Sequence, residues 1–115
     1  MALKINLREV NGISVISLEG RIGVGEEANL LRSKVKGLLA DGKNKLVLNM
    51  SAVTLVDSAG LGTLVGLHHS AASCGASLRL CNLGTILKEL LQITRLLTVF
   101  EVSATEADAI ASLTK

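Results

Sequence analysis

The feature that most constrains the fold is a long stretch of chain with almost no charge. Between Leu46 and Leu78 the only Asp, Glu, Lys or Arg is Asp57. A stretch this apolar has to be buried, either in a membrane or in the core of a globular domain. A membrane-spanning helix needs about 20 mostly apolar residues in succession. Polar residues interrupt this stretch too often for that, at Asn49, Ser51, Thr54, Asp57, Ser58, Thr63, His68, His69 and Ser70. We therefore expect two buried elements, a strand and then a helix, and no membrane insertion.

The N-terminal segment and the cysteines indicate where the protein works and whether it binds a metal. Charged residues at positions 4, 8 and 9 occupy the place where a secretory signal would have its apolar segment, so we expect a cytoplasmic protein. Cys74 and Cys81 form neither a metal quartet nor a Cys-x-x-Cys pair. We interpret them as small apolar side chains, one near a helix end and one in a strand, and expect no metal site.

Composition limits the size of the fold and its partners. The 115 residues suffice for one domain, spanning 1–115. Hydrophobic residues make up 49% of the chain, yet Phe100 is its only aromatic residue and its formal net charge is only +2. Nucleic-acid binding draws on aromatic stacking and on strong positive charge. We therefore expect no direct contact with nucleic acid.

The hydrophobic periodicity changes several times along the chain. It alternates with period two before and after Asn11-Gly12, a dipeptide that favours a tight hairpin turn, and then takes on helical spacing up to Asp41-Gly42. The later segments alternate between the two patterns. The expected strands are 3–10, 13–19, 45–50, 77–82 and 98–102, and the later helices are 58–73, 85–92 and 105–113. A hairpin followed by strand-helix units predicts an α/β fold whose mixed sheet is parallel after the first strand.

The junction after the third strand is the most informative part of the sequence. A buried strand and a short loop lead to Asp57-Ser58, at the start of the uncharged helix. Ser58 is positioned to act as its N-cap, which typically contributes about 1 kcal/mol. Gly60 and Gly62 each cost roughly 0.8–1.0 kcal/mol in a helix relative to Ala. Glycine at these positions suggests that something approaches the backbone closely.

Residues 57–62, DSAGLG, resemble the D-S-x-G-L-G signature of STAS domains, in particular that of anti-sigma factor antagonists. The resemblance extends to residues 18–22, 46–64 and 77–96 and to the final helix, and covers about 4–113. It implies the STAS fold, with a mixed sheet of four or five strands that opens with an antiparallel hairpin and is covered by about four helices.

The same resemblance implies a function. Such proteins are not enzymes and need no cofactor. They bind an anti-sigma factor that is also a serine-protein kinase, and so release a sigma factor. Phosphorylation of the serine at the position of Ser58 breaks the complex, and a PP2C-type phosphatase restores it. The positions expected to bind the partner are Asp57, Ser58, Ala59, Gly60 and Gly62, with Gly23 and Gly25 in the loop before the first helix.

Elementary electrostatics is consistent with a switch at Ser58. A phosphoserine adds about −1.5 to −2 charges, which a helix N-terminus tolerates because its N–H groups and dipole favour an anion. The fold should therefore survive, while the surface beside Asp57 becomes strongly negative. Asp57 itself has two open interpretations, a partner contact or only a helix-start acid. Leu61 is expected in the core.

Three positions depart from the pattern of the family. The loop at 21–27 lacks the acidic residue that many relatives carry and has Gly23 and Gly25 instead, followed by Glu26 and Glu27. Asn49 replaces a common Asp, and Ala59 replaces a common Ser. These changes leave the serine in place but affect which partner is recognised.

Other functions fit less well. Residues 23–28 match G-x-G-x-x-A, the dinucleotide fingerprint, but two glutamates would face the pyrophosphate, and the preceding strand is expected in a hairpin rather than a βαβ unit. A serine hydrolase is excluded because His68 and His69 lie about 15 Å along the helix from Ser58; we interpret them as one surface and one half-buried histidine. Gly62 and Gly66 are expected to let the helix lie close to the sheet.

The main alternative to an anti-sigma factor antagonist is a free-standing STAS docking subunit of a transporter or stress-signalling complex, which phosphorylation does not control.

Overall fold

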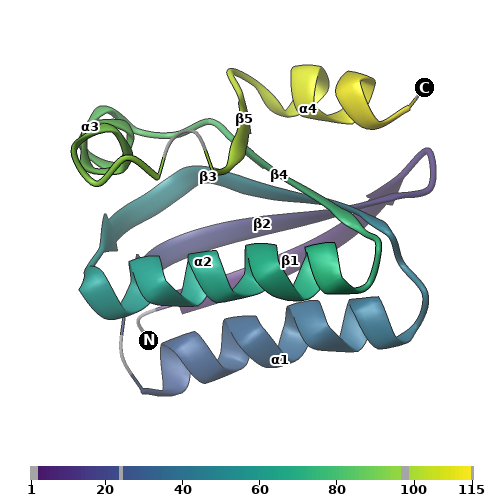
Figure 1. The fold of residues 1–115 in the computed structure, drawn as a ribbon, viewed down its shortest axis with the longest axis horizontal. Helices are drawn as coiled ribbons and strands as arrows, with labels where there is room; N and C mark the ends of the chain where they lie inside the picture. The colour runs from purple at the N-terminus through teal and green to yellow at the C-terminus, as the bar shows by residue number, and fades with distance from the viewer. Residues whose placement is uncertain (1–2, 24, 97–98, 115) are drawn as a thin grey trace.

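The structure, a computed structural model, describes residues 3–23, 25–96 and 99–114. Strands and helices alternate after an initial pair of strands (Figure 1). In chain order the elements are β1 (Leu3–Val10), β2 (Ile13–Ile22), α1 (Glu26–Ala40), β3 (Lys45–Val56), α2 (Ser58–Ser73), β4 (Ser77–Cys81), α3 (Thr85–Ile93), β5 (Glu101–Ser103) and α4 (Glu106–Leu113).

The strands form one sheet in the order in which they occur along the chain, β1-β2-β3-β4-β5. β1 and β2 are antiparallel, and each later pair is parallel. The turn between β1 and β2 consists of Asn11 (φ 54°) and Gly12 (φ 80°), residue types that tolerate positive φ. The predicted hairpin and the predicted mixed α/β sheet are therefore confirmed.

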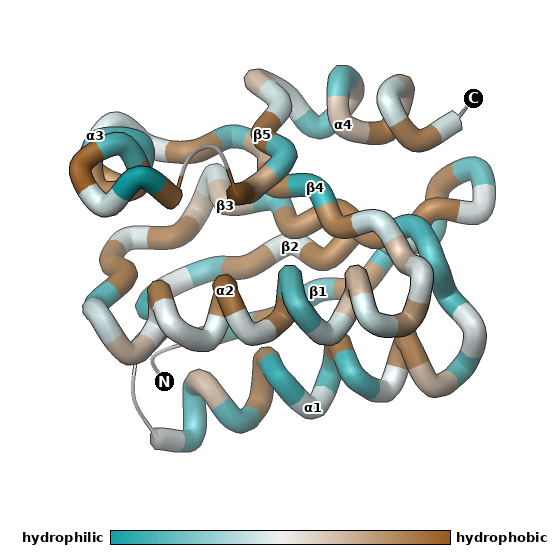
Figure 2. Tube along the Cα trace, viewed as in Figure 1, coloured by the Kyte–Doolittle hydropathy of each residue, from teal (hydrophilic) through white to brown (hydrophobic). Residues whose placement is uncertain are grey.

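Helices cover the two faces of the sheet unequally. α1 and α2 lie side by side along one face, whereas α4 packs on strands β3, β4 and β5 (Figure 1). The larger core lies under α1 and α2, and a smaller one lies under α4, formed by Ile13, Val15, Val47, Cys81, Ala109 and Leu113. In Figure 2 α1 carries hydrophilic colours along its length, while α2 is mainly white and brown. Within the described ranges, no helix combines the length and the hydrophobicity needed to cross a membrane.

Four strands differ from their predicted bounds, β4 only in ending at Cys81 rather than at position 82. β2 continues to Ile22 and β3 to Val56, because the second halves of these strands pair with each other, with register shifts between Ser17 and Glu19 and between Gly20 and Arg21. The short loop predicted before Asp57 is therefore wrong, since the chain stays extended up to that residue. β5 is Glu101–Ser103 rather than 98–102, and position 98 lies outside the described residues.

Glu106, in the first turn of α4, connects three elements. Its carboxylate accepts hydrogen bonds from Arg8 of β1 (2.6 Å) and from Asn49 of β3 (2.8 Å). These hydrogen bonds, that from Arg8 above all, hold the pKa of Glu106 below its ordinary value of 4.5.

Burial and the nearby Glu106 carboxylate raise the pKa of the Cys81 thiol to about 11, so this thiol stays protonated at neutral pH. Cys74, by contrast, is exposed at the end of α2.

The pH dependence of stability tests the role of Glu106. Because the pKa of Glu106 is lowered in the folded state, the carboxylate stabilises the fold at pH values above 4.5, the pKa of the unfolded state. This stabilisation is lost as the pH falls through the folded-state pKa. We expect Glu106→Gln to unfold at lower urea than the parent protein at pH 7 and the difference to shrink at pH values below both pKa values. Glu101→Gln is the control, because that carboxylate is 63% exposed. If Glu106→Gln lowered the urea concentration for unfolding by the same amount at pH 7 and at the acidic pH, the ionised carboxylate would not be the stabilising group.

Candidate functional site

α2 begins at Ser58 and is capped by the residue before it. The Asp57 carboxylate accepts a hydrogen bond from the Gly60 N–H (2.8 Å), and the Asp57 carbonyl accepts one from the Leu61 N–H (2.8 Å). Asp57 is thus the N-cap, and the prediction that Ser58 caps the helix is wrong. β3 stays extended up to Val56 and α2 begins directly after Asp57, so the cap lies one residue earlier than predicted. Ser58 is exposed, and its hydroxyl is hydrogen-bonded to no side chain or backbone group of the described chain.

Gly60 brings the first turn of α2 against the end of β2. A Cβ atom at Gly60 would lie only 2.1 Å from the carbonyl oxygen of Ile22. The same carbonyl accepts a hydrogen bond from the Asp57 N–H (3.3 Å). The close approach expected at Gly60 is therefore confirmed, but the neighbouring backbone belongs to the chain itself. This contact places Ser58 relative to the β2–α1 loop.

The β2–α1 loop and the first turn of α1 lie beside Asp57, and Glu27 of α1 places a second carboxylate near it. Gly23 is buried, and a Cβ atom there would lie 2.9 Å from Asp57 Oδ2 and 3.1 Å from Glu27 Oε1. The other Glu27 oxygen accepts a hydrogen bond from Arg21 (3.2 Å). Gly25 is exposed, with φ +82°, and position 24 lies outside the described residues. The loop therefore presents Gly25 to solvent and encloses Gly23.

The exposed residues of α2 between Ser58 and Gly66 are all small. Ala59, Gly62 and Gly66 are exposed, and a Cβ atom at either glycine would meet nothing within 4 Å. The prediction that Gly62 and Gly66 let the helix approach the sheet is wrong, because both glycines lie on the opposite side of the helix. Leu61 is half-buried against the main core, in agreement with its prediction. Among the residues that the structure describes, no neighbour requires glycine at 62 or 66.

Two opposing electrostatic influences act on a negative charge at Ser58. The N-terminus of α2 favours negative charge through its N–H groups and dipole. The adjacent Asp57 and Glu27 carboxylates oppose further negative charge, and the nearby cation Arg21 is already paired with Glu27. A dianion on Ser58 is thus compatible with the helix itself, whereas it changes sharply the charge that an approaching protein meets.

The histidines and the glycine loop offer no catalytic constellation. His69 is exposed and His68 is half-buried, its ring 5.6 Å from that of Phe100, as the surface and half-buried interpretation predicts. The described residues contain no group of three or more His, Cys, Asp or Glu placed to hold a metal ion. One argument against a nucleotide site was wrong: β2 also pairs in parallel with β3, so β2, α1 and β3 do form a βαβ unit. The acidic first turn of α1 still disfavours a phosphate there.

Two residues near the site were not assigned to it from the sequence. Glu27 faces Asp57 across Gly23, and Arg32 of α1 lies within hydrogen-bonding distance of the Thr63 hydroxyl of α2 (3.4 Å). That hydroxyl in turn donates to the carbonyl of Ala59 (3.0 Å). The acidic start of α1 was visible in the sequence. Which residues of α2 it faces depends on how the two helices pack.

The chain is similar to known proteins in both sequence and fold. The protein-family model described as "STAS domain" matches residues 4–109. The anti-sigma-B factor antagonist of Bacillus subtilis (strain 168) is 31% identical over 104 residues, which are 90% of this chain and 94% of that protein. The crystal structure of an anti-sigma factor antagonist from Mycobacterium paratuberculosis has a TM-score of 0.85 at 22% identity, covering 99% of this chain and 96% of that one. A sulfate transporter family protein from Wolinella succinogenes has a TM-score of 0.70 at 19% identity, covering 88% and 84%.

Two glycine substitutions two residues apart should have opposite effects on stability. Gly60→Ala places a methyl group against the Ile22 carbonyl, and we expect a loss of roughly 1–3 kcal/mol, the usual range for overpacking. Gly62→Ala meets open space and should gain up to about 0.8–1.0 kcal/mol from helix propensity. Urea denaturation of both variants measures the difference. Equal stability of the two proteins would rule out the close contact at Gly60.

Proposed function

The chain belongs to the STAS domain family, and from that premise we propose that it is an anti-sigma factor antagonist, a non-enzymatic binding protein controlled by the state of Ser58. The family model and the Bacillus subtilis relative support the general role. The observation that carries the switch is the Ser58 hydroxyl, exposed in the first turn of α2 and hydrogen-bonded to nothing in the described chain. Such a protein would work in the cytoplasm.

The partner in this proposal is an anti-sigma factor that is also a serine-protein kinase. Because Asp57 rather than Ser58 caps the helix, the hydroxyl can be phosphorylated without the loss of a helix cap. The adjacent Ala59 is small and exposed, which leaves room for a kinase active site. A PP2C-type phosphatase then removes the phosphate and restores binding.

The partner surface in this proposal extends from the β2–α1 loop onto the outer side of α2. It comprises Asp57, Ser58, Ala59 and Gly62, with Gly25 at its edge. Gly60 and Gly23 are buried, and they contribute by shaping this surface rather than by direct contact. A partner backbone can approach Gly62 and Gly66 closely, because neither carries a side chain and both are exposed.

Substitutions of Ser58 test the switch directly. Ser58→Asp adds a carboxylate beside Asp57 and Glu27, so we expect a normal fold but at least roughly tenfold weaker binding to the cognate anti-sigma factor, since like charges at an interface cost several kcal/mol. Ser58→Ala should bind like the parent protein, because it adds no charge. Calorimetry measures the affinities, and circular dichroism checks the fold.

Mass spectrometry after incubation with the anti-sigma factor and ATP should place one phosphate on Ser58. A partner that binds but leaves Ser58 unmodified would instead favour a docking subunit without phosphorylation. Equal affinity of Ser58→Asp and Ser58→Ala would show that charge at this position is not the switch.

The outer side of α2 can be tested with a matched pair of glycines. Gly62→Ala adds one methyl group to the proposed surface and should weaken partner binding by roughly tenfold, within the usual cost of overpacking, while the free protein gains stability. Gly37→Ala is the control, because Gly37 is also exposed in a helix, α1, with nothing within 4 Å of its Cβ position. Calorimetric titration of both variants should separate them. Unchanged affinity in Gly62→Ala would remove Gly62 from the interface.

A further inference from the structure

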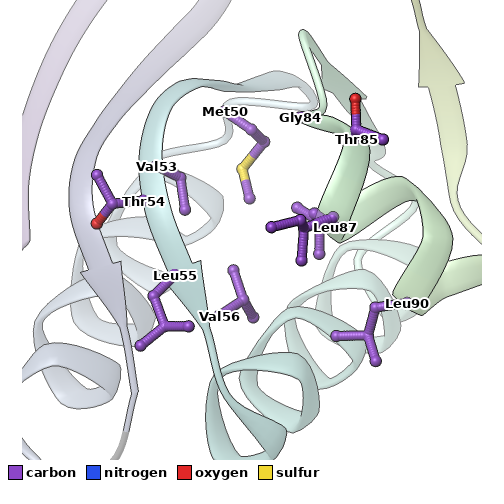
Figure 3. Close-up of a pocket in the computed structure, with 10 residues that line it drawn as sticks. Met50, Val53, Thr54, Leu55, Val56, Gly84, Thr85, Leu87 and Leu90 are labelled. Atoms are coloured by element: carbon purple, nitrogen blue, oxygen red, sulfur yellow. The ribbon is translucent and has the colours of Figure 1, made fainter.

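A pocket lies between the second half of β3 and helix α3 (Figure 3). Its volume is about 350 Å³. It is lined by Met50, Val53, Thr54, Leu55, Val56, Gly84, Thr85, Ile86, Leu87 and Leu90. None of these ten residues carries a charge, and two of them, Thr54 and Thr85, have a polar side chain.

The pocket exists because two neighbouring strands differ in length. β4 pairs with β3 only from Lys45 to Asn49, and then the chain turns at Asn82, in the left-handed region (φ 57°), and enters α3. The remainder of β3 pairs with β2 on its other side. The space that a longer β4 would occupy is bordered instead by the side chains of α3.

The floor and the walls of the pocket are mainly apolar. Met50 and Leu87 belong to the main core, where they are 1% and 9% exposed. In Figure 3 the side chains of Met50, Val56 and Leu87 converge on the same space, whereas Thr54 and Leu55 lie on the far side of the strand. The thioether of Met50 adds an adaptable apolar surface. Such a lining would cost an ionic group its hydration without a compensating charge.

The shape and size of the pocket restrict the ligand further. Ligand pockets usually have volumes of about 300–1,000 Å³ and mainly apolar linings. The lining from Met50 to Val56 extends along roughly 20 Å of strand at 3.3 Å per residue. A small volume distributed along a strand suits a narrow chain better than a globular molecule.

We propose that this pocket binds the uncharged, linear hydrocarbon chain of a small molecule. Its head group would lie outside the pocket, since the lining offers no charge. Binding here does not depend on the regulatory role of Ser58, although Val56 lines the pocket and is followed directly by Asp57 and Ser58.

The neutral fluorescent probe N-phenyl-1-naphthylamine tests the pocket in the full-length protein. Its fluorescence should rise on binding, and 1-decanol should displace it. 1-Adamantanol has the same number of carbon atoms in a globular shape, and we expect it to displace the probe roughly tenfold less well. Equal competition by the two alcohols would overturn the linear-chain assignment, and absence of probe binding would overturn the site.

Substitutions locate the bound probe. Val53→Phe fills the pocket and should weaken probe binding by roughly tenfold. Ile86→Ala provides a second variant on an exposed position, in case Val53→Phe fails to fold, and should weaken binding about threefold. Ile93→Ala is its matched control, because Ile86 and Ile93 both lie on α3, are 81% and 80% exposed, and only Ile86 lines the pocket.

Probe binding that is equally affected by Ile86→Ala and Ile93→Ala would place the probe on the outer face of α3 and overturn the proposal. Weaker binding of the anti-sigma factor by Ile86→Ala, with no probe bound to the parent protein, would assign the pocket to the protein partner instead. Failure of the Ser58 substitutions to affect the partner, by contrast, would leave the pocket proposal intact, so the two proposals fail separately.

Discussion

The contact between the first turn of α2 and the carbonyl group of Ile22 positions the rest of the site. It forms because Gly60 has no side chain, and the Asp57 N–H donates to the same carbonyl. Through this contact the end of β2, the end of β3 and the start of α2 meet at one point. Ser58 is therefore held where three elements meet, and the β2–α1 loop lies beside it. A side chain placed in this way by the packing loses little conformational entropy if a partner binds it.

The lack of charge along α2 has two different physical origins. On the inner side of the helix, Leu64, Leu67 and Ala71 pack into the main core, where charge would be costly. On the outer side, Gly62 and Gly66 are exposed, and a Cβ atom at either would meet none of the described residues within 4 Å. Helix stability alone would favour Ala at both positions. The proposed partner surface would account for both glycines, and the carboxylates of Asp57 and Glu27 lie near it.

Much of the fold could be predicted because it depends on local patterns. The Asn11-Gly12 turn requires positive φ, which these residues tolerate, and the uncharged helix over 58–73 follows from its composition and spacing. The length of β3 could not be predicted in this way. Its second half, after Met50, is half exposed and irregular in pattern, and it forms a strand only because β2 continues beside it. The identity of the helix cap depended on that extension, and so the sequence pointed to Ser58 instead of Asp57.

The sequence by itself determined the order of the elements, the α/β class and the position of Ser58 at a strand-helix junction, since these depend on periodicity and on a short contiguous signature. Only the tertiary structure decided which atoms surround that serine. Glu27 meets Asp57 across Gly23, Gly60 meets Ile22, and the pocket opens where β4 ends before β3. Each of these features joins residues far apart in the chain, and their proximity depends on how helices and strands of unequal length pack against one another. A local pattern carries no information about such distances.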